Sequence, residues 1–396
     1  MSSTSSDAGN PSSLASSAST IITVGTQPFD EDELYAAVGV MRRSRQGSSR
    51  PSGVTSPAPV STPTSPSAVG ARRNSDDTTS SGDMLDFEPE LVKQSASMSS
   101  SVRAHVYEGG IRYHAFRDGK YALPNDEAEQ NRDDMKHMMT LMLCNGAHFL
   151  APVEARLKDG CEVLDLGTGT GIWAIELGDK YPNTQIIGID LSPIQPDFVP
   201  ENVHFFVDDF EEDWVDPENK YDYIHVRFTL FSVRDRKALY RRALRHLKPG
   251  GYIEFQELDY WPRCDDESLI DETPYALRDY IKFVKDGMRN FGADIHAVRS
   301  LPDELKAAGF DDVQLTTHKC PLGLWPKDKR LRLCGLFLRT AFMDGLRGVS
   351  RRPLTALGWT QLQIEMFLVD VRKSIMDPDK HAYLTFNVVY GRKPVT

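Results

Sequence analysis

The chain has 396 residues, a hydrophobic fraction of 40% and a net charge of −11, from 46 Lys and Arg against 57 Asp and Glu. This balance argues against a general binder of nucleic acid or of anionic membranes, because phosphate recognition needs clustered basic side chains. The five cysteines are scattered without a CxxC pair, which argues against zinc and fits reduced thiols in the cytosol or nucleus. No apolar run approaches the roughly 18 residues of a membrane span, and the Ser-rich start lacks the apolar segment of a secretory signal. We therefore expect no metal, no membrane span, no secretion, and a nuclear or nucleo-cytoplasmic location.

Residues 1–100 form the first predicted segment. They consist mostly of Ser, Thr, Pro, Ala and Gly. Such a composition buries too little apolar surface to offset the conformational entropy of the chain. We predict a disordered tail here, followed by an N-terminal lid or helical extension at 101–150 and by the main domain at 151–396.

One stretch of this tail, residues 29–43, has the pattern of a short binding helix. Asp30 and Glu33 fit a capping box at its start. One face of the helix is apolar, with Leu34, Val38 and Met41 at i, i+4 and i+7. About 12 residues are too few for a stable free helix in water. The pattern therefore predicts a segment that folds on a partner or on its own domain, and the alternative is a transient helix with no partner.

The extension that follows is aromatic first and helical afterwards. Its helix is expected to begin at Asn125 or Asp126, ahead of a methionine-rich apolar face. Three aromatic residues precede that helix, namely Tyr113, Phe116 and Tyr121. Either they pack against the domain, or they close over a ligand as a lid with Tyr121 nearest to it.

From residue 151 onward, strands and helices alternate. We predict strands at 161–166, 184–190, 202–209, 221–228 and 249–258, and helices at 171–181 and 234–247. Helical insertions are expected at about 265–294 and 327–376, around a helix at 301–310 and a strand at 311–320, with a β-rich end at 381–394. Apolar strands that alternate with helices indicate an α/β fold, whose sheet is covered by helices on both faces.

The strongest local signal is VLDLGTGTGIW, where the first strand ends and a helix begins. Gly167, Gly169 and Gly171 allow a tight turn and a close approach of the backbone to a ligand. The helix start presents free N–H groups to an anion such as a carboxylate. A dinucleotide fingerprint would require a third glycine where Ile172 stands, so the loop fits a methyltransferase better than an NAD site.

Acidic residues end the next two strands, at the edge of the sheet where this loop lies. Asp190 follows the loop by about 20 residues, where a carboxylate can hold both hydroxyls of a ribose. Asp209 ends the third strand, where a side chain can reach an adenine, whereas a solvated turn is the alternative for Asp208 and Asp209. The residues predicted to bind the cofactor are Tyr121, Asp165, Gly167, Thr168, Gly169, Gly171, Asp190, Leu191, Asp208, Asp209, Phe210 and Arg227.

Several segments resemble the fungal LaeA-like methyltransferases, which associate with velvet proteins and regulate secondary metabolism and development. They include RYHAFRDGKYALPNDEAEQNR, LDLGTGTGIWAIELGDKYP, IDLSPIQP, PRCDDESL and the terminal HAY…VYGRKP. The resemblance spans about 105–394. It implies the class I methyltransferase fold, Rossmann-like with a seven-stranded mixed sheet, and S-adenosyl-L-methionine as cofactor. It further implies a nuclear or shuttling regulator with velvet-type partners. The chain departs from LaeA at Thr168 and in the segment VRFTLFSV, as a paralogue would.

Few residues indicate the chemistry of the acceptor. No Asn-Pro-Pro-Tyr or Asp-Pro-Pro-Tyr follows the fourth strand, which argues against methylation of amide or adenine amino groups. His225 alternates inward on that strand and fits a buried structural role better than that of a base. Trp173 is expected to pack beneath the cofactor. No catalytic residue is assigned.

Polar residues follow the fifth predicted strand, namely Asp259, Arg263, Asp265 and Asp266. They fit a substrate-binding edge and a surface turn equally well. Two functions are therefore kept. The first is a methyltransferase that regulates secondary metabolism with protein partners, and the second is a biosynthetic enzyme that methylates a small metabolite. The long tail favours the first, since a pathway enzyme has little use for it.

Overall fold

The computed structural model describes residues 104–395. The predicted tail and its helix at 29–43 lie outside the described residues. Among the described residues, no helix is both long enough and apolar enough to cross a membrane. All five cysteines are free thiols.

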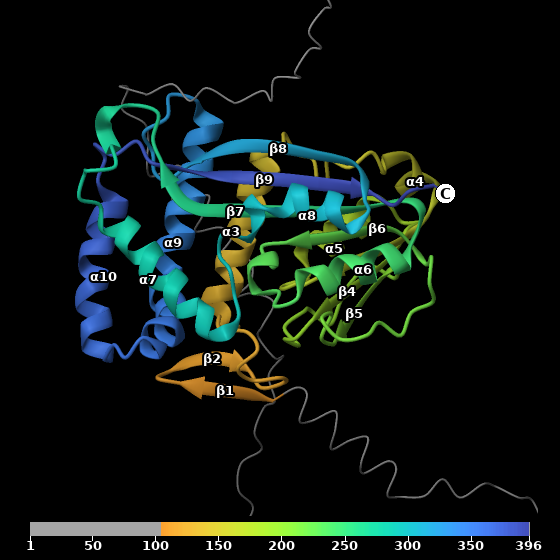
Figure 1. Cartoon of the computed structure of the whole chain (residues 1–396), viewed down its shortest axis with the longest axis horizontal. Coiled ribbons are helices and arrows are strands. Elements are labelled where there is room, and N and C mark those ends of the chain that lie inside the picture. The colour runs from red at the N-terminus through yellow and green to blue at the C-terminus, as the bar shows by residue number, and fades with distance from the viewer. Residues whose placement is uncertain (1–103, 396) are drawn as a thin grey trace, which may run out of the picture.

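A seven-stranded mixed sheet forms the centre of the molecule (Figure 1). Its strands lie in the order β5-β4-β3-β6-β7-β9-β8, and β9 runs antiparallel to both β7 and β8 while the others run parallel. Their bounds are Glu162–Leu166 for β3, Gln185–Asp190 for β4, Val203–Val207 for β5, Tyr221–Arg227 for β6, Leu247–Arg263 for β7, Asp311–Pro321 for β8 and Tyr383–Arg392 for β9. The predicted seven-stranded mixed sheet is thereby confirmed.

Helices cover both faces of the sheet, and alternating strand residues supply a separate core for each face. The bounds are Glu154–Asp159 for α4, Ile172–Lys180 for α5, Arg236–His246 for α6 and Leu301–Ala308 for α8. On one face, Val163 of β3 and Tyr223 of β6 pack with side chains of α4 and α5. On the other face, Leu164 and Ile224 pack with side chains of α6 and α8. This alternation follows from the period of two along a strand.

A wall of helices stands at one end of the sheet (Figure 1). It consists of α3 (Glu127–Leu143), α7 (Ala276–Met288), α9 (Lys329–Ala356) and α10 (Gln361–Met376), which share one large apolar core. The last three belong to the predicted helical insertions. Helix α9 is 28 residues long and contains Pro353. Pro353 is buried against Gly287 of α7. This packing offsets the free-energy cost of the backbone hydrogen bond that a proline removes from a helix.

The structure corrects two expectations near the ends of elements. A hairpin of β1 (His105–Glu108) and β2 (Ile111–His114) was not predicted, although its turn residues Gly109 and Gly110 both have positive φ and are a known hairpin signal. Strand β7 continues to Arg263 instead of ending at 258, because its last part pairs with β9.

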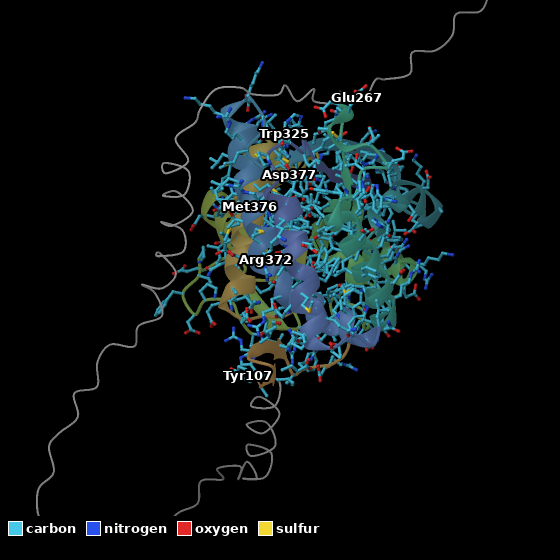
Figure 2. The ribbon with its side chains drawn as sticks, turned by 90° about the vertical axis from the view of Figure 1, so that its left-hand side faces the viewer. Tyr107, Glu267, Trp325, Arg372, Met376 and Asp377 are labelled. Atoms are coloured by element: carbon cyan, nitrogen blue, oxygen red, sulfur yellow. The ribbon has the colours of Figure 1, made fainter. Side chains whose placement is uncertain are left out.

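The outer face of α10 carries exposed apolar side chains, including Leu362, Met366, Val369 and Met376. Figure 2 shows Arg372 and Met376 on this helix. Helix α10 is held at its start by a capping box between Thr360 and Gln363.

Candidate functional site

The glycine loop joins β3 to α5 and is tied to the neighbouring strand β4. The backbone N–H groups of Gly167 and Thr168 donate to the carbonyl of Ile189, at 2.8 and 3.1 Å. Any side chain at Gly171 would collide with the ring of Phe205. At Gly169, by contrast, an added Cβ would meet only Asp133 Oδ2, 3.7 Å away. The backbone of Gly169 therefore borders open space, as an approach to a ligand requires.

The start of α5 has no side-chain cap. Helix α3, on the other side of the cleft, differs, since Asp126 caps it by accepting from the N–H of Glu129 at 3.1 Å. The free N–H groups of the first turn of α5 remain available to an anion or to water.

Asp190 ends β4 beside this loop, as predicted. Its carboxylate accepts from the N–H of Gly169 at 2.9 Å and from that of Ser192 at 2.8 Å. Burial raises the pKa of Asp190 to about 6, although these two hydrogen bonds act to lower it. Each oxygen keeps a lone pair for a further donor.

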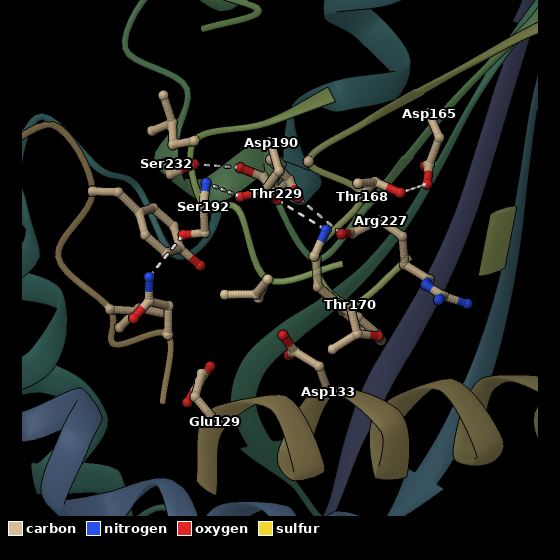
Figure 3. Close-up of a pocket in the computed structure, with 18 of the residues that line it drawn as sticks. Glu129, Asp133, Asp165, Thr168, Thr170, Asp190, Ser192, Arg227, Thr229 and Ser232 are labelled. Atoms are coloured by element: carbon tan, nitrogen blue, oxygen red, sulfur yellow. Dashed lines mark hydrogen bonds between the residues drawn. The ribbon is translucent and has the colours of Figure 1, made fainter. Parts of the chain in front are cut away.

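A cleft of about 1180 Å³, including its open mouth, lies in front of the loop. Figure 3 shows Asp133 on α3 across from Thr170 of the loop. The fold brings ten of the twelve predicted residues to the lining of this cleft, namely Tyr121, Asp165, Gly167, Thr168, Gly169, Asp190, Leu191, Asp209, Phe210 and Arg227.

The two remaining predicted residues do not line the cleft. Gly171 is turned toward Phe205 and begins α5 with a φ of 78°. Asp208 is exposed, whereas the neighbouring Asp209 is buried. Adjacent residues at the end of a strand point in opposite directions, so only one of the pair faces inward.

Arg227 ends β6 and is among the residues that line the cleft. Its Nη1 is buried and has no hydrogen-bond partner. Burial lowers the pKa of Arg227, although Asp165 and Asp133 lie near enough to raise it. A carboxylate bound in the cleft would supply the missing acceptor.

Comparison with known proteins identifies the family. The methyltransferase domain model matches residues 135–315. Methyltransferase pytC of Aspergillus terreus is 39% identical over 300 residues, which cover 75% of this chain and 91% of that protein. The chain belongs to this methyltransferase family.

Other members of the family carry different names. The secondary metabolism regulator LAE1 of Cochliobolus heterostrophus is 35% identical, covering 74% of this chain and 95% of that protein. The protein-methionine methyltransferase laeA of Emericella nidulans is 36% identical, covering 73% and 76%. The family uses S-adenosylmethionine as methyl donor, and the predicted resemblance to LaeA-like proteins is confirmed.

Beneath the glycine loop, buried polar side chains form a hydrogen-bonded group that stacks on Trp173. Asp165 accepts from the hydroxyl of Thr168 at 2.6 Å and pairs with Nδ1 of His225 at 2.8 Å. His225 stacks on Trp173 at 3.6 Å with an interplanar angle of 6°. Burial lowers the pKa of His225, so its imidazole is neutral and acts here as a structural group. Trp173 is also buried, as the expected packing role requires.

The extension contributes one aromatic residue to the methyltransferase cleft. Tyr121 lines it and lies 6.1 Å from the ring of Phe231. Tyr113 is instead fully buried under the guanidinium of Arg352, and Phe116 does not line the cleft. Lys120, next to Tyr121, forms an ion pair with Asp209 and joins the extension to the end of β5.

Helix α3 supplies four charged residues that sequence reasoning missed, namely Glu129, Arg132, Asp133 and Lys136. Arg132 donates to both carboxylate oxygens of Glu129, with an Nε–Oε2 distance of 2.8 Å. Lys136 pairs with Asp133 at 2.7 Å. The only sequence signal for these pairs is the i, i+3 spacing of opposite charges. Exposed helix faces carry the same spacing, so it does not predict that the pairs are buried.

The polar residues after the fifth predicted strand do not line the cleft. Asp259 is buried within β7 and accepts from Arg299 at 2.8 Å and from His296 at 3.0 Å, so it lies neither in a surface turn nor along the cleft, the two alternatives that the sequence had left open. Asp265 pairs with Lys319 at 2.6 Å, and Asp266 pairs with His381 at 2.6 Å. These contacts fasten β7 to its neighbours.

His137, His148 and Glu176 form a cluster whose ligand atoms lie within 4.8 Å of one another. Both Nε2 atoms contact Glu176 Oε2, at 2.8 and 2.9 Å, and burial lowers the pKa of His137 to about 4. Nε2–H groups of the two imidazoles that donate to one carboxylate oxygen account for this geometry. Both Nδ1 atoms are buried without a partner, whereas metal-bound histidines normally donate from that nitrogen. We assign no metal to the cluster, which links α3 to α5.

Proposed function

We propose that the cleft in front of the glycine loop is the S-adenosylmethionine site of this methyltransferase. Asp190 would accept from the ribose hydroxyls, and Asp209 and Phe210 would lie at the adenine end. Arg227 and the uncapped start of α5 would receive the carboxylate. The observation that carries the proposal is the buried Nη1 of Arg227, which lacks an acceptor beside a loop whose backbone borders open space.

Bound there, the cofactor supplies a methyl group on a sulfonium, which the lone pair of an acceptor takes by in-line displacement. The contribution of the protein is alignment and exclusion of water. Tyr121 and Phe231 cover the cleft from the lid side, and the buried Trp173 supports its floor. No side chain is assigned as a base.

For the biological role, we propose a regulator of secondary metabolism. LAE1, named as a secondary metabolism regulator, matches this chain over 95% of its own length, and relatives named as the secondary metabolism regulator laeA match it over 76% to 86% of theirs. On this proposal, the protein acts in the nucleus with velvet-type partners, and the tail segment at 29–43 is where a partner docks. A pull-down from cells with the tagged Leu34→Asp, Val38→Asp double variant should then recover fewer partner proteins than a pull-down with the wild type. Unchanged partners together with unchanged protease sensitivity of the tail would exclude that role for the segment.

The second candidate role is a biosynthetic enzyme that methylates a small metabolite. Methyltransferase pytC favours it, since this chain covers 91% of that protein. Deletion of the gene separates the two roles. A regulator should alter many metabolites, and a pathway enzyme should alter one pathway.

The methyltransferase activity itself is tested by incubating the purified protein with labelled S-adenosylmethionine and cell extract. We expect transfer of label to a distinct acceptor, and Asp190→Ala should abolish it. Transfer at the wild-type rate by Asp190→Ala would exclude the proposed cofactor site.

A further inference from the structure

A second cavity, here called the chamber, lies beside the cofactor cleft inside the wall of helices. It has a volume of about 590 Å³, part of it open to solvent. Helices α7 and α9 form most of its walls. The chamber and the cleft share four lining residues, namely Leu123, Arg132, Phe231 and Tyr260. A molecule in the chamber would therefore lie next to a molecule in the cleft.

The walls of the chamber are almost entirely apolar. Helix α7 contributes Ile281, Val284 and Met288, and helix α9 contributes Phe342, Leu346 and Val349. The polar atoms come from Arg132 and from the phenols of Tyr260 and Tyr280. Burial raises the pKa of Tyr280 to about 12 and also raises that of Tyr260, so both phenols are neutral.

Arg132 is the only charged side chain among the described residues that line the chamber, and its charge is already paired. Burial alone would lower the pKa of Arg132, but the bidentate pair with Glu129 raises it above its ordinary value. The side chain of Arg132 passes over Gly345 of α9, where a Cβ would lie 2.7 Å from its Cδ. A charged ligand would thus lose its hydration without gaining a free counter-charge.

We propose that the chamber holds the methyl acceptor, and that this acceptor is a neutral, largely apolar small molecule. The proposal rests on the proposed cofactor site, since it takes the methyl donor to lie in the adjoining cleft. The apolar walls and the lack of a free counter-charge favour a neutral acceptor over a charged one such as a lysine side chain.

The test uses the full-length protein saturated with S-adenosylhomocysteine and the neutral fluorescent probe N-phenyl-1-naphthylamine. We expect saturable binding of the probe. Val349→Phe on α9 and Val284→Phe on α7 should each weaken it by at least about tenfold, because the added ring fills the chamber. Val369→Phe, the same change on the exposed face of α10, should leave it unchanged. Thermal unfolding shows whether each variant is folded. If a variant is unfolded, the binding of the probe to the wild type alone tests the proposal.

The possible failures are distinguishable. If the wild type does not bind S-adenosylhomocysteine in calorimetry, the proposed function is wrong. If it binds S-adenosylhomocysteine but not the probe, or if all three valine variants bind the probe equally, only the chamber proposal is wrong. Displacement of the probe by a methionine- or lysine-bearing decapeptide would likewise overturn the choice of a small molecule.

Discussion

The cofactor cleft and the chamber treat their polar groups in opposite ways. Along the cleft, Arg227 has a buried nitrogen without a partner, and α5 begins without a side-chain cap. At the chamber, Arg132 is the one charged side chain among the described lining residues, and it is paired with Glu129. An unpaired polar group beside the cleft marks where a polar ligand completes the structure. A paired charge among apolar walls marks where a neutral ligand fits.

The largest expected effect concerns the paired charges of the helical wall. Glu129→Ala leaves Arg132 buried without its counter-charge, which should lower the free energy of unfolding by about 3–5 kcal/mol. Urea unfolding measures this loss. Glu154→Ala, which removes the partner of the exposed Lys158, is the control and should change stability little. Equal, small losses in both variants would mean that the Arg132 pair is not buried in solution.

At the sheet edge, Gly169→Val should weaken the binding of S-adenosylhomocysteine by at least about tenfold. The new side chain enters the space in front of the loop, at a φ of 57° that valine rarely adopts. Calorimetry measures the affinity. Gly146→Val is the matched control, because Gly146 also has a positive φ but lies outside the cleft lining. If both variants bind equally well, the backbone at Gly169 does not approach the ligand.

The affinity for S-adenosylhomocysteine should also depend on pH through Asp190. Its folded-state pKa of about 6 means that the carboxylate loses its charge as the pH falls through 6. Because the ionised form is the better acceptor of hydroxyl hydrogen bonds, affinity should be constant above pH 7. Below pH 6, it should fall by up to about tenfold per pH unit. Calorimetry between pH 5 and 8 checks this, and Asp190→Asn should bind weakly with a flat profile. The same slope in Asp190→Asn would assign the dependence to another group.

The sheet half could be predicted from sequence because its signals are local. Glycine spacing, an acid at the end of a strand and apolar strand runs each lie within a few residues, and ten predicted residues line the cleft. The errors at the sheet edge concern the direction in which a side chain points, since Asp208 and Asp209 are adjacent but only Asp209 is buried.

The chamber could not be predicted, because its walls come from distant segments. Val284 and Val349 each fit the buried face of a helix, and periodicity does not reveal that a cavity remains between them. The pair of Glu129 and Arg132 has the i, i+3 spacing of an ordinary surface pair, and only tertiary packing buries it.

The central claim is that the cleft beside the glycine loop binds S-adenosylmethionine, and a calorimetric titration with S-adenosylhomocysteine tests it most directly. Wild type, Asp190→Ala and Asp208→Ala are compared, the last being the same change at an exposed aspartate outside the cleft lining. Asp190→Ala removes charge-assisted hydrogen bonds worth about 1.5–3 kcal/mol each, so its affinity for S-adenosylhomocysteine should be at least about tenfold lower than that of the wild type. Asp208→Ala should match wild type. Wild-type affinity in Asp190→Ala, or an equal loss in both variants, would contradict the assignment.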